Sequence, residues 1–160
     1  NKFTPSFHNV INYKNDNTFF TLSFGGNNDN KQHSYLFNHT SNTWNKNIKY
    51  NKKEFYINQG SQSAFINIKN RNNIIISTTD ANDKNNFSIF DINKQQFIKK
   101  LEPPKEFNNV GFYYHTFIKY SLLENKYIIM RGDKIIYFSI DQNFTINITK
   151  QIKIIIVCYI

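Results

Sequence analysis

The chain of 160 residues contains one cysteine, one tryptophan, three prolines and five glycines. The lone thiol, Cys158, can form neither a disulfide framework nor a thiolate metal site. The longest apolar run, 154–160, has seven residues, whereas a membrane-spanning helix needs about 20. Helical periodicity is nearly absent, and only 92–101 could be read as a short helix. The sequence therefore excludes disulfide-stapled, thiolate-metal and helical membrane proteins.

Arginine is scarce as well, although the formal net charge is +9. The two arginines are Arg71 and Arg131, and the lysines are dispersed along the chain in runs of at most two. A basic chain can bind nucleic acid, but arginine is the preferred residue for bidentate contacts to phosphates and bases. The composition therefore argues against a nucleic-acid partner.

Length and apolar content predict one domain, 1–160, with a hydrophobic core. Apolar residues make up 39% of the chain and aromatic residues 17%, unlike the composition of disordered proteins. No signal-peptide pattern opens the chain, so we expect a reducing, cytoplasmic setting. The first residue is Asn1 rather than Met, which suggests a segment of a longer protein.

The most regular pattern begins at Phe19. Six strand-favouring residues, Phe19–Phe24, end at Gly25-Gly26, and a polar loop then leads to a second apolar run, Tyr35–Phe37. A polar turn separates Phe37 from Trp44. Strand, glycine break, polar loop, strand and turn are together typical of a β-meander.

The same pattern recurs twice along the chain. The segments 8–13, 63–68 and 115–120 align as first strands. Three pairs of aromatic residues are each seven positions apart around a polar turn: Phe37 and Trp44, Phe90 and Phe97, Tyr137 and Phe144. We expect Trp44, Phe97 and Phe144 to occupy equivalent places between neighbouring sheets. On this interpretation Trp44→Ala costs about 3–5 kcal/mol through a core cavity.

A strand that ends in Gly-Gly, then Tyr, then Trp about seven residues on resembles the kelch repeat, the blade unit of a β-propeller. The resemblance implies an all-β propeller fragment of about three four-stranded antiparallel blades. The approximate blades are 5–50, 59–104 and 111–150, with 151–160 a strand of the last or next blade. The second and third units depart from the pattern, because Gly25-Gly26 becomes Thr79-Asp80 and Arg131-Gly132.

Three blades do not close a propeller, which typically has four to eight. We therefore expect two outer blade faces without a neighbour, and a chain that oligomerises or aggregates by itself. The rest of the propeller would come from missing sequence or from another chain.

The resemblance implies a protein-interaction module that presents loops on one face to a partner. Such a module could recruit substrates in a larger adaptor protein, for example a ubiquitin-ligase adaptor. The loop residues predicted to bind the partner are Asn28, Asp29, Lys31, His33, Asn82, Lys84, Asp133 and Lys134. The sequence names neither the partner nor the total number of blades.

No nucleophile motif, phosphate loop or paired carboxylates can be placed, so we predict neither enzyme activity nor a cofactor or metal. His8, Ser63 and His115 share one repeat position. A metal pair of the two histidines is conceivable, but packing or hydrogen bonding is the simpler interpretation. The alternative function is a degenerate enzyme-type propeller that binds a carbohydrate or small ligand. An ionisable pocket around His8 and His115 would favour it.

Overall fold

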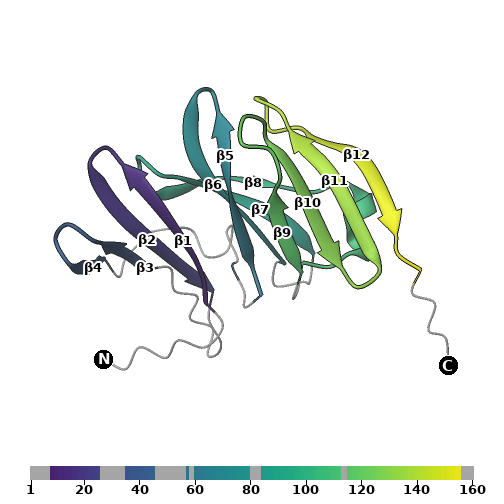
Figure 1. Cartoon of the computed structure of the whole chain (residues 1–160), viewed down its shortest axis with the longest axis horizontal. Coiled ribbons are helices and arrows are strands. Elements are labelled where there is room, and N and C mark those ends of the chain that lie inside the picture. Colours follow the sequence, from purple (N-terminus) through teal and green to yellow (C-terminus); the bar gives the residue numbers. More distant parts are fainter. Residues whose placement is uncertain are drawn as a thin grey trace.

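The structure, a computed structural model, describes residues 8–25, 35–45, 57, 60–79, 84–112 and 115–155. These residues form three four-stranded antiparallel sheets that follow one another along the chain (Figure 1). Sheet 1 contains β1 (His8–Asn15), β2 (Thr18–Gly25), β3 (Tyr35–Asn38) and β4 (Thr43–Asn45). Sheet 2 contains β5 (Gln62–Ile68), β6 (Arg71–Thr79), β7 (Asn85–Asp91) and β8 (Gln96–Leu101). Sheet 3 contains β9 (Thr116–Lys119), β10 (Lys126–Arg131), β11 (Lys134–Ile140) and β12 (Ile146–Lys153). The expected all-β class with three four-stranded antiparallel sheets is confirmed.

Neighbouring sheets pack face to face through two apolar interfaces. The first strands β1, β5 and β9 lie in contact in that order, and Figure 1 shows the three sheets side by side. In sheets 2 and 3, we call the face that packs on the preceding sheet the leading face and the opposite face the trailing face. In sheet 1, the trailing face is the one that packs on sheet 2, and the leading face is the opposite one. The first interface joins the trailing face of sheet 1 to the leading face of sheet 2, with Tyr13, Phe20, Leu22, Phe24, Leu36, Ile74, Ile76, Phe90 and Phe97. The second joins sheets 2 and 3, with Ala64, Ile66, Ile75, Phe87, Ile89, Leu101, Phe117, Tyr127, Ile129, Ile136 and Phe138.

Sheet 2 differs from its neighbours because both of its faces are covered. In β6 every residue from Asn73 to Thr79 is buried, which explains the unbroken run of isoleucines Ile74–Ile76. A strand with one solvated face would instead alternate apolar and polar residues. The segment 92–101, for which a helix was considered from sequence, contains strand β8.

The second interface is rich in aromatic rings that surround Phe87. Its ring centroid lies between 4.9 and 6.0 Å from those of Phe107, Phe112, Phe117 and Phe138. Phe107 comes from a short 3₁₀ helix, η1 (Lys105–Asn109), in the connection between sheets 2 and 3. The sequence predicted a plain connector there. The helix places Phe107, which is fully buried, among these rings.

The hairpin turns are built from residues that tolerate a positive φ. Lys69 and Asn70 join β5 to β6 with φ values of 52° and 59°, the combination of a type I′ turn. Gly132 has φ of 57° and, with Asp133, joins Arg131 to its cross-strand partner Lys134. The sequence Arg131-Gly132-Asp133 is thus the end of a strand and its tight turn.

The third aromatic pair predicted from the seven-residue spacing does not form. Phe37 pairs directly with Trp44, and Phe90 with Phe97. In sheet 3, Tyr137 pairs instead with Lys150, and Phe144 lies in the turn with φ of 65°. The equivalence of Phe144 with Trp44 and Phe97 was therefore wrong.

The cause is a longer hairpin between β11 and β12. Asp141 closes this loop, because its Oδ1 accepts hydrogen bonds from the backbone N–H groups of Asn143 and Thr145, each at 2.8 Å. Strand β11 continues to Ile140 before the turn, and Phe138 takes the buried place on the leading face. Strand β12 of the third sheet extends to Lys153 and so includes the first three residues of 151–160, the segment expected to be a strand of the last or next blade.

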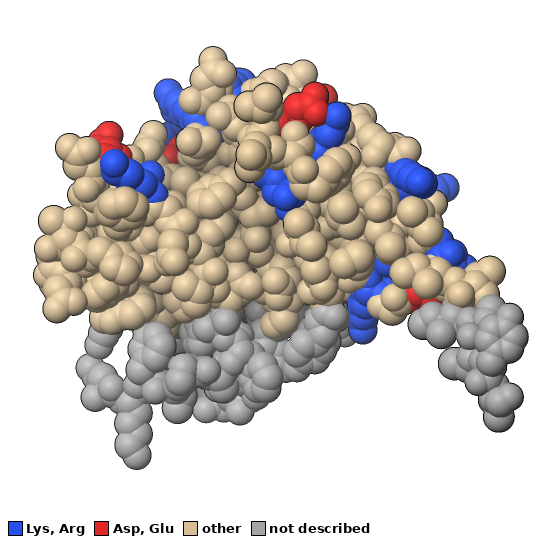
Figure 2. Space-filling model, in the orientation of Figure 1, with Lys and Arg blue, Asp and Glu red and all other residues tan. Residues whose placement is uncertain are grey.

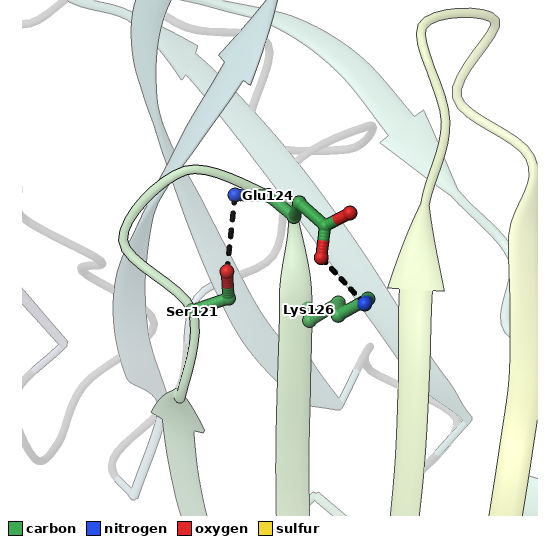
Figure 3. Close-up of polar contacts among 3 residues, drawn as sticks. All are labelled: Ser121, Glu124 and Lys126. Atoms are coloured by element: carbon green, nitrogen blue, oxygen red, sulfur yellow. Dashed lines mark hydrogen bonds and ion pairs between the residues drawn. The ribbon is translucent and has the colours of Figure 1, made fainter.

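The loop between β9 and β10 is held by its own polar contacts (Figure 3). The backbone N–H of Glu124 donates to Ser121 Oγ at 3.1 Å, and its carboxylate pairs with Lys126 Nζ at 2.5 Å. Leu122 and Leu123 project from this loop with exposed fractions of 99% and 95%. Substitutions at these two leucines therefore leave the sheet interfaces untouched.

Polar groups also bridge sheets 2 and 3. The side chain of Asn125 accepts from the backbone N–H of Asn67 at 2.8 Å and donates to the carbonyl of the same residue at 2.6 Å. The hydroxyl of Tyr127 donates to the carbonyl of Phe65 at 3.0 Å. These bonds pair backbone groups of strand β5 that face sheet 3.

We predict that Asn125→Ala lowers the free energy of unfolding by about 1–2 kcal/mol, because Asn67 loses a donor and an acceptor partner at once. Urea unfolding monitored by circular dichroism measures the loss. Asn143→Ala is the control, because that exposed side chain lies in the β11–β12 turn, and we expect it to change stability by about 0.5 kcal/mol or less. Equal losses in the two variants would contradict the bridging role of Asn125.

Candidate interaction surface

The leading face of sheet 1 carries exposed aromatic side chains. Cross-strand partners share a face and successive residues of a strand lie on opposite faces, so this side is opposite to buried Leu22 and Leu36. Phe19 is 56% exposed and Trp44 is 45% exposed. We call this surface the Trp44 face, formed by Val10, Asn12, Lys14, Phe19, Thr21, Tyr35, Phe37, His39 and Trp44.

Aromatic rings on the Trp44 face are in direct contact with one another. The ring of Trp44 lies 4.9 Å from that of Phe37, tilted by 44°, and 6.3 Å from that of Tyr35 in an edge-on arrangement. The imidazole of His39 lies edge-on to Phe37 at 4.9 Å. Strands β3 and β4 therefore hold these four rings as one cluster.

A polar network lies beside the rings. The hydroxyl of Thr21 donates to Asn12 Oδ1 at 2.7 Å, and His39 Nε2 lies 2.7 Å from the same hydroxyl oxygen. Because a hydroxyl has one hydrogen to donate, His39 donates its Nε2–H to Thr21. The sequence analysis missed this network. The register of β1 against β2, set by the two-residue turn at 16–17, was the signal that could have revealed it.

Trp44 is therefore not the core residue that the sequence analysis predicted. Its face belongs to the first of the three described sheets, and its side chain is 45% exposed. The equivalent pair in sheet 2, Phe90 and Phe97, is buried, with exposed fractions of 0% and 8%, because sheet 1 covers it. The expected cost of Trp44→Ala falls accordingly, from a core cavity to about 1 kcal/mol or less for the isolated chain.

The trailing face of sheet 3 is an apolar surface whose side chains are partly exposed. Ile118 and Tyr120 are each 45% exposed, and Ile118 pairs with Ile128, which pairs with Tyr137. The rings of Tyr120 and Tyr137 meet edge-on at 5.9 Å. We call this surface the Ile118 face, formed by Ile118, Tyr120, Ile128, Met130, Ile135 and Tyr137.

Most of the loop residues predicted to bind a partner lie outside the described residues: Asn28, Asp29, Lys31, His33 and Asn82, together with Gly26 of the repeat motif. Gly25 is the last residue of β2. Lys84 is exposed and borders a pocket of about 440 Å³ with Lys100, Glu102 and Lys105.

The other two predicted loop residues lie at a different place. Asp133 is in the β10–β11 turn, where its carboxylate is 3.9 Å from Lys153 Nζ, and Lys134 begins β11. Lys134 borders a separate pocket of about 330 Å³ with Ile136 and Ile152. The structure thus does not gather Lys84, Asp133 and Lys134 into one site.

His115 is a buried structural residue. Its Nε2 lies 2.5 Å from Ser77 Oγ, and its ring stacks on Phe112 with centroids 5.2 Å apart. Burial lowers the pKa of His115 to about 4, and the positive charge of Arg131 acts in the same direction. A neutral imidazole that hydrogen-bonds across sheets 2 and 3 fits the packing interpretation.

The other two residues of this repeat position do not join His115. Ser63 donates to Asn9 Oδ1 at 2.9 Å, in the first interface, and the side chain of His8 lies outside the described residues. Within the described ranges, no three or more His, Cys, Asp or Glu residues come together as metal ligands. Neither pocket described above is lined by His115.

No helix in the described part of the chain is long and apolar enough to cross a membrane. The chain matches no protein-family model, and no curated protein or solved structure is significantly similar to it. Its function is therefore inferred from its own geometry.

Proposed function

We propose that the chain is a three-blade segment of a kelch-like β-propeller and serves as a protein-interaction module. The observation that carries the proposal is that Trp44 of sheet 1 is 45% exposed, whereas its counterpart in sheet 2, Phe97, is 8% exposed. Phe37 and Trp44 are cross-strand partners on β3 and β4, as are Phe90 and Phe97 on β7 and β8. The ring centroids are 4.9 Å and 5.3 Å apart.

The arrangement of the sheets supports the propeller part of the proposal. In each sheet the strand order follows the chain order, and the first strands of successive sheets lie in contact. A blade cannot bury both of its faces alone, and stacking on its neighbours covers them. Among the described residues, sheet 2 packs on another sheet with both faces, and sheets 1 and 3 each do so with one face.

The chemistry of the Trp44 face supports the interaction part. Trp and Tyr are enriched among the residues that dominate protein–protein binding, and charged residues are depleted at interface centres. Lys14, over the ring of Phe19 at 5.5 Å, is the one charged residue among those that define the face. Sheet 1 lies at the left end of the molecule in Figure 2. Charged residues are visible near the top of that end, and the surface of described residues below them is almost free of charge. Such a surface suits a protein partner.

The test is site-specific photo-crosslinking in cells that produce the chain. The photoreactive residue p-benzoylphenylalanine is placed at position 44 in one variant. In the control it is placed at position 93, because Asn93 is exposed in the β7–β8 turn of the middle sheet. We expect a protein adduct from position 44 and little or none from position 93. No adduct from position 44, or equal adducts from both, would contradict the proposal.

A further inference from the structure

The loop between β9 and β10 ends in two adjacent leucines that take no part in the sheet interfaces. Leu122 and Leu123 are 99% and 95% exposed, more than any other large apolar side chain in the described part of the chain. We call these two residues the leucine tip. The fold leaves their apolar surface in water, so burial of both side chains against a ligand would be strongly favourable.

The loop that carries the leucine tip is closed by hydrogen bonds at its base. The backbone N–H of Tyr120 donates to the carbonyl of Lys126 at 3.1 Å. Within the loop, Ser121 Oγ accepts from the N–H of Glu124 (Figure 3). The side chain of Asn125 ties the loop to strand β5 of sheet 2. A loop that is already ordered loses little conformational freedom on binding, which favours association.

The leucine tip lies at a hairpin end of sheet 3, away from the two faces of the sheet. The corresponding turn of sheet 2, Lys69 and Asn70, also lies at the top of Figure 1. Both residues of this turn are exposed, although other sheets pack on both faces of sheet 2. A further sheet packed on sheet 3 would therefore still leave the leucine tip open.

The charges around the leucine tip leave a positive balance. Hydrogen bonds join its loop to the ends of two neighbouring hairpins, β5–β6 and β11–β12. Lys69 and Arg71 are exposed at the first of them. Glu124 forms an ion pair with Lys126, and the carboxylate of Asp141 accepts backbone N–H groups of its own loop. Three cations thus stand against two carboxylates, on a chain with a net charge of +9, so this end favours an anionic ligand.

The form of the leucine tip fits a fluid apolar layer better than a groove in a protein. Both leucines project fully, so a ligand must surround the tip to bury them. The acyl boundary of a bilayer does so, and peripheral proteins bind there through buried apolar side chains and cations that face anionic lipids. Leucine is under-represented among the residues that dominate protein–protein binding. Tyr120, 45% exposed just before the loop, is of a type enriched at the headgroup level.

We propose that this end of the chain binds the surface of an anionic lipid bilayer, with the leucine tip inserted at the acyl boundary and with Lys69 and Arg71 facing the headgroups. The site is separate from the Trp44 face. The proposal goes beyond the interaction role proposed above, and either can hold without the other.

Sedimentation with lipid vesicles tests the proposal on the purified chain. We expect stronger binding to phosphatidylcholine vesicles that contain phosphatidylserine than to vesicles of phosphatidylcholine alone. The double substitution Leu122→Ser, Leu123→Ser should lower the partition coefficient at least about tenfold, because it removes both apolar side chains. Lys69→Gln with Arg71→Gln should lower binding to the anionic vesicles about tenfold, because each cation near such a surface adds to the attraction. Circular dichroism checks that each variant folds.

Ile155→Ser is the matched control. Ile155 is also apolar and 81% exposed, but it follows β12 at the other end of sheet 3 (Figure 1). Its substitution should leave the partition coefficient unchanged. A loss equal to that of the double leucine variant would overturn the proposal, because vesicle binding would then not depend on the leucine tip.

A tryptophan placed in the tip reports insertion. Leu122→Trp in a Trp44→Phe background moves the single tryptophan to the loop, and bromine-labelled acyl chains quench an indole that enters the bilayer. We expect strong quenching at position 122 and little at Trp44 in the wild-type chain. Vesicle binding without quenching at position 122 would overturn the proposal, as would an absence of binding to either kind of vesicle. If p-benzoylphenylalanine at position 122 then gave a protein adduct in cells, the tip would belong to a protein interface instead.

Discussion

Replacing Phe87 by alanine is expected to lower the free energy of unfolding by about 3–5 kcal/mol, the range for removing a buried phenylalanine from a core. The side chain is fully buried and touches four other phenylalanine rings contributed by η1, sheet 3 and the connection between them. The rings around it come from several elements, so no single side chain can move to fill the cavity. Urea unfolding measures the loss.

The control for this prediction is Phe19→Ala, which removes the same side chain from a position that is 56% exposed. We expect it to cost about 1 kcal/mol or less. A cost at Phe87 no greater than that at Phe19 would show that the rings around Phe87 do not form the core.

Acid is expected to destabilise the protein through His115. Its pKa is about 4 in the folded protein, mainly because of burial, and about 6.5 when exposed in the unfolded chain. The unfolded state therefore binds the proton first as pH falls. Stability is full above about pH 6.5, declines as pH drops toward 4, and loses up to about 3 kcal/mol below that, at 1.36 kcal/mol for each pKa unit.

His115→Gln separates this effect from other titrations. Glutamine can still hydrogen-bond to Ser77 but does not titrate, so the variant should lose most of the decline between pH 6.5 and 4. Asp141, whose pKa the backbone N–H groups of its loop hold below its usual range, adds acid sensitivity at lower pH in both proteins. An unchanged pH dependence in the variant, measured by urea unfolding at each pH, would show that His115 is not the responsible group.

The sequence predicted the strands well because their signals are local. Each first strand and second strand lies where β-branched and aromatic residues gather between turn-forming residues. The alignment of first strands also holds in the structure, because Ile11, Ile66 and Ile118 all lie on trailing faces. A period-two pattern states which residues share a face, and that was enough to place these three residues on corresponding faces of the three sheets.

The errors arose where position depends on something beyond the repeat. Phe144 was placed by spacing, but a hairpin loop longer than its counterparts moved it out of register, and nothing in a seven-residue spacing reports loop length. Trp44 was assigned to the core because the seven-residue spacing aligned it with Phe97 and Phe144. Whether a leading face is covered depends on a neighbouring sheet, which a single repeat cannot reveal. The residues of the Trp44 face could be predicted from strand register. The exposed fractions of their side chains could not.

Some of the lysines that are dispersed in the sequence lie on the outermost strands of the sheets, where they protect the strand edges. Strands β8 and β12 end their sheets and carry exposed lysines, among them Lys99, Lys150 and Lys153, while β4 ends sheet 1 after three residues. An edge that is short or lined with lysine resists backbone pairing with another chain, the route to fibrils. A protein so rich in isoleucine and phenylalanine thus has outermost strands that resist polymerisation through their backbone edges.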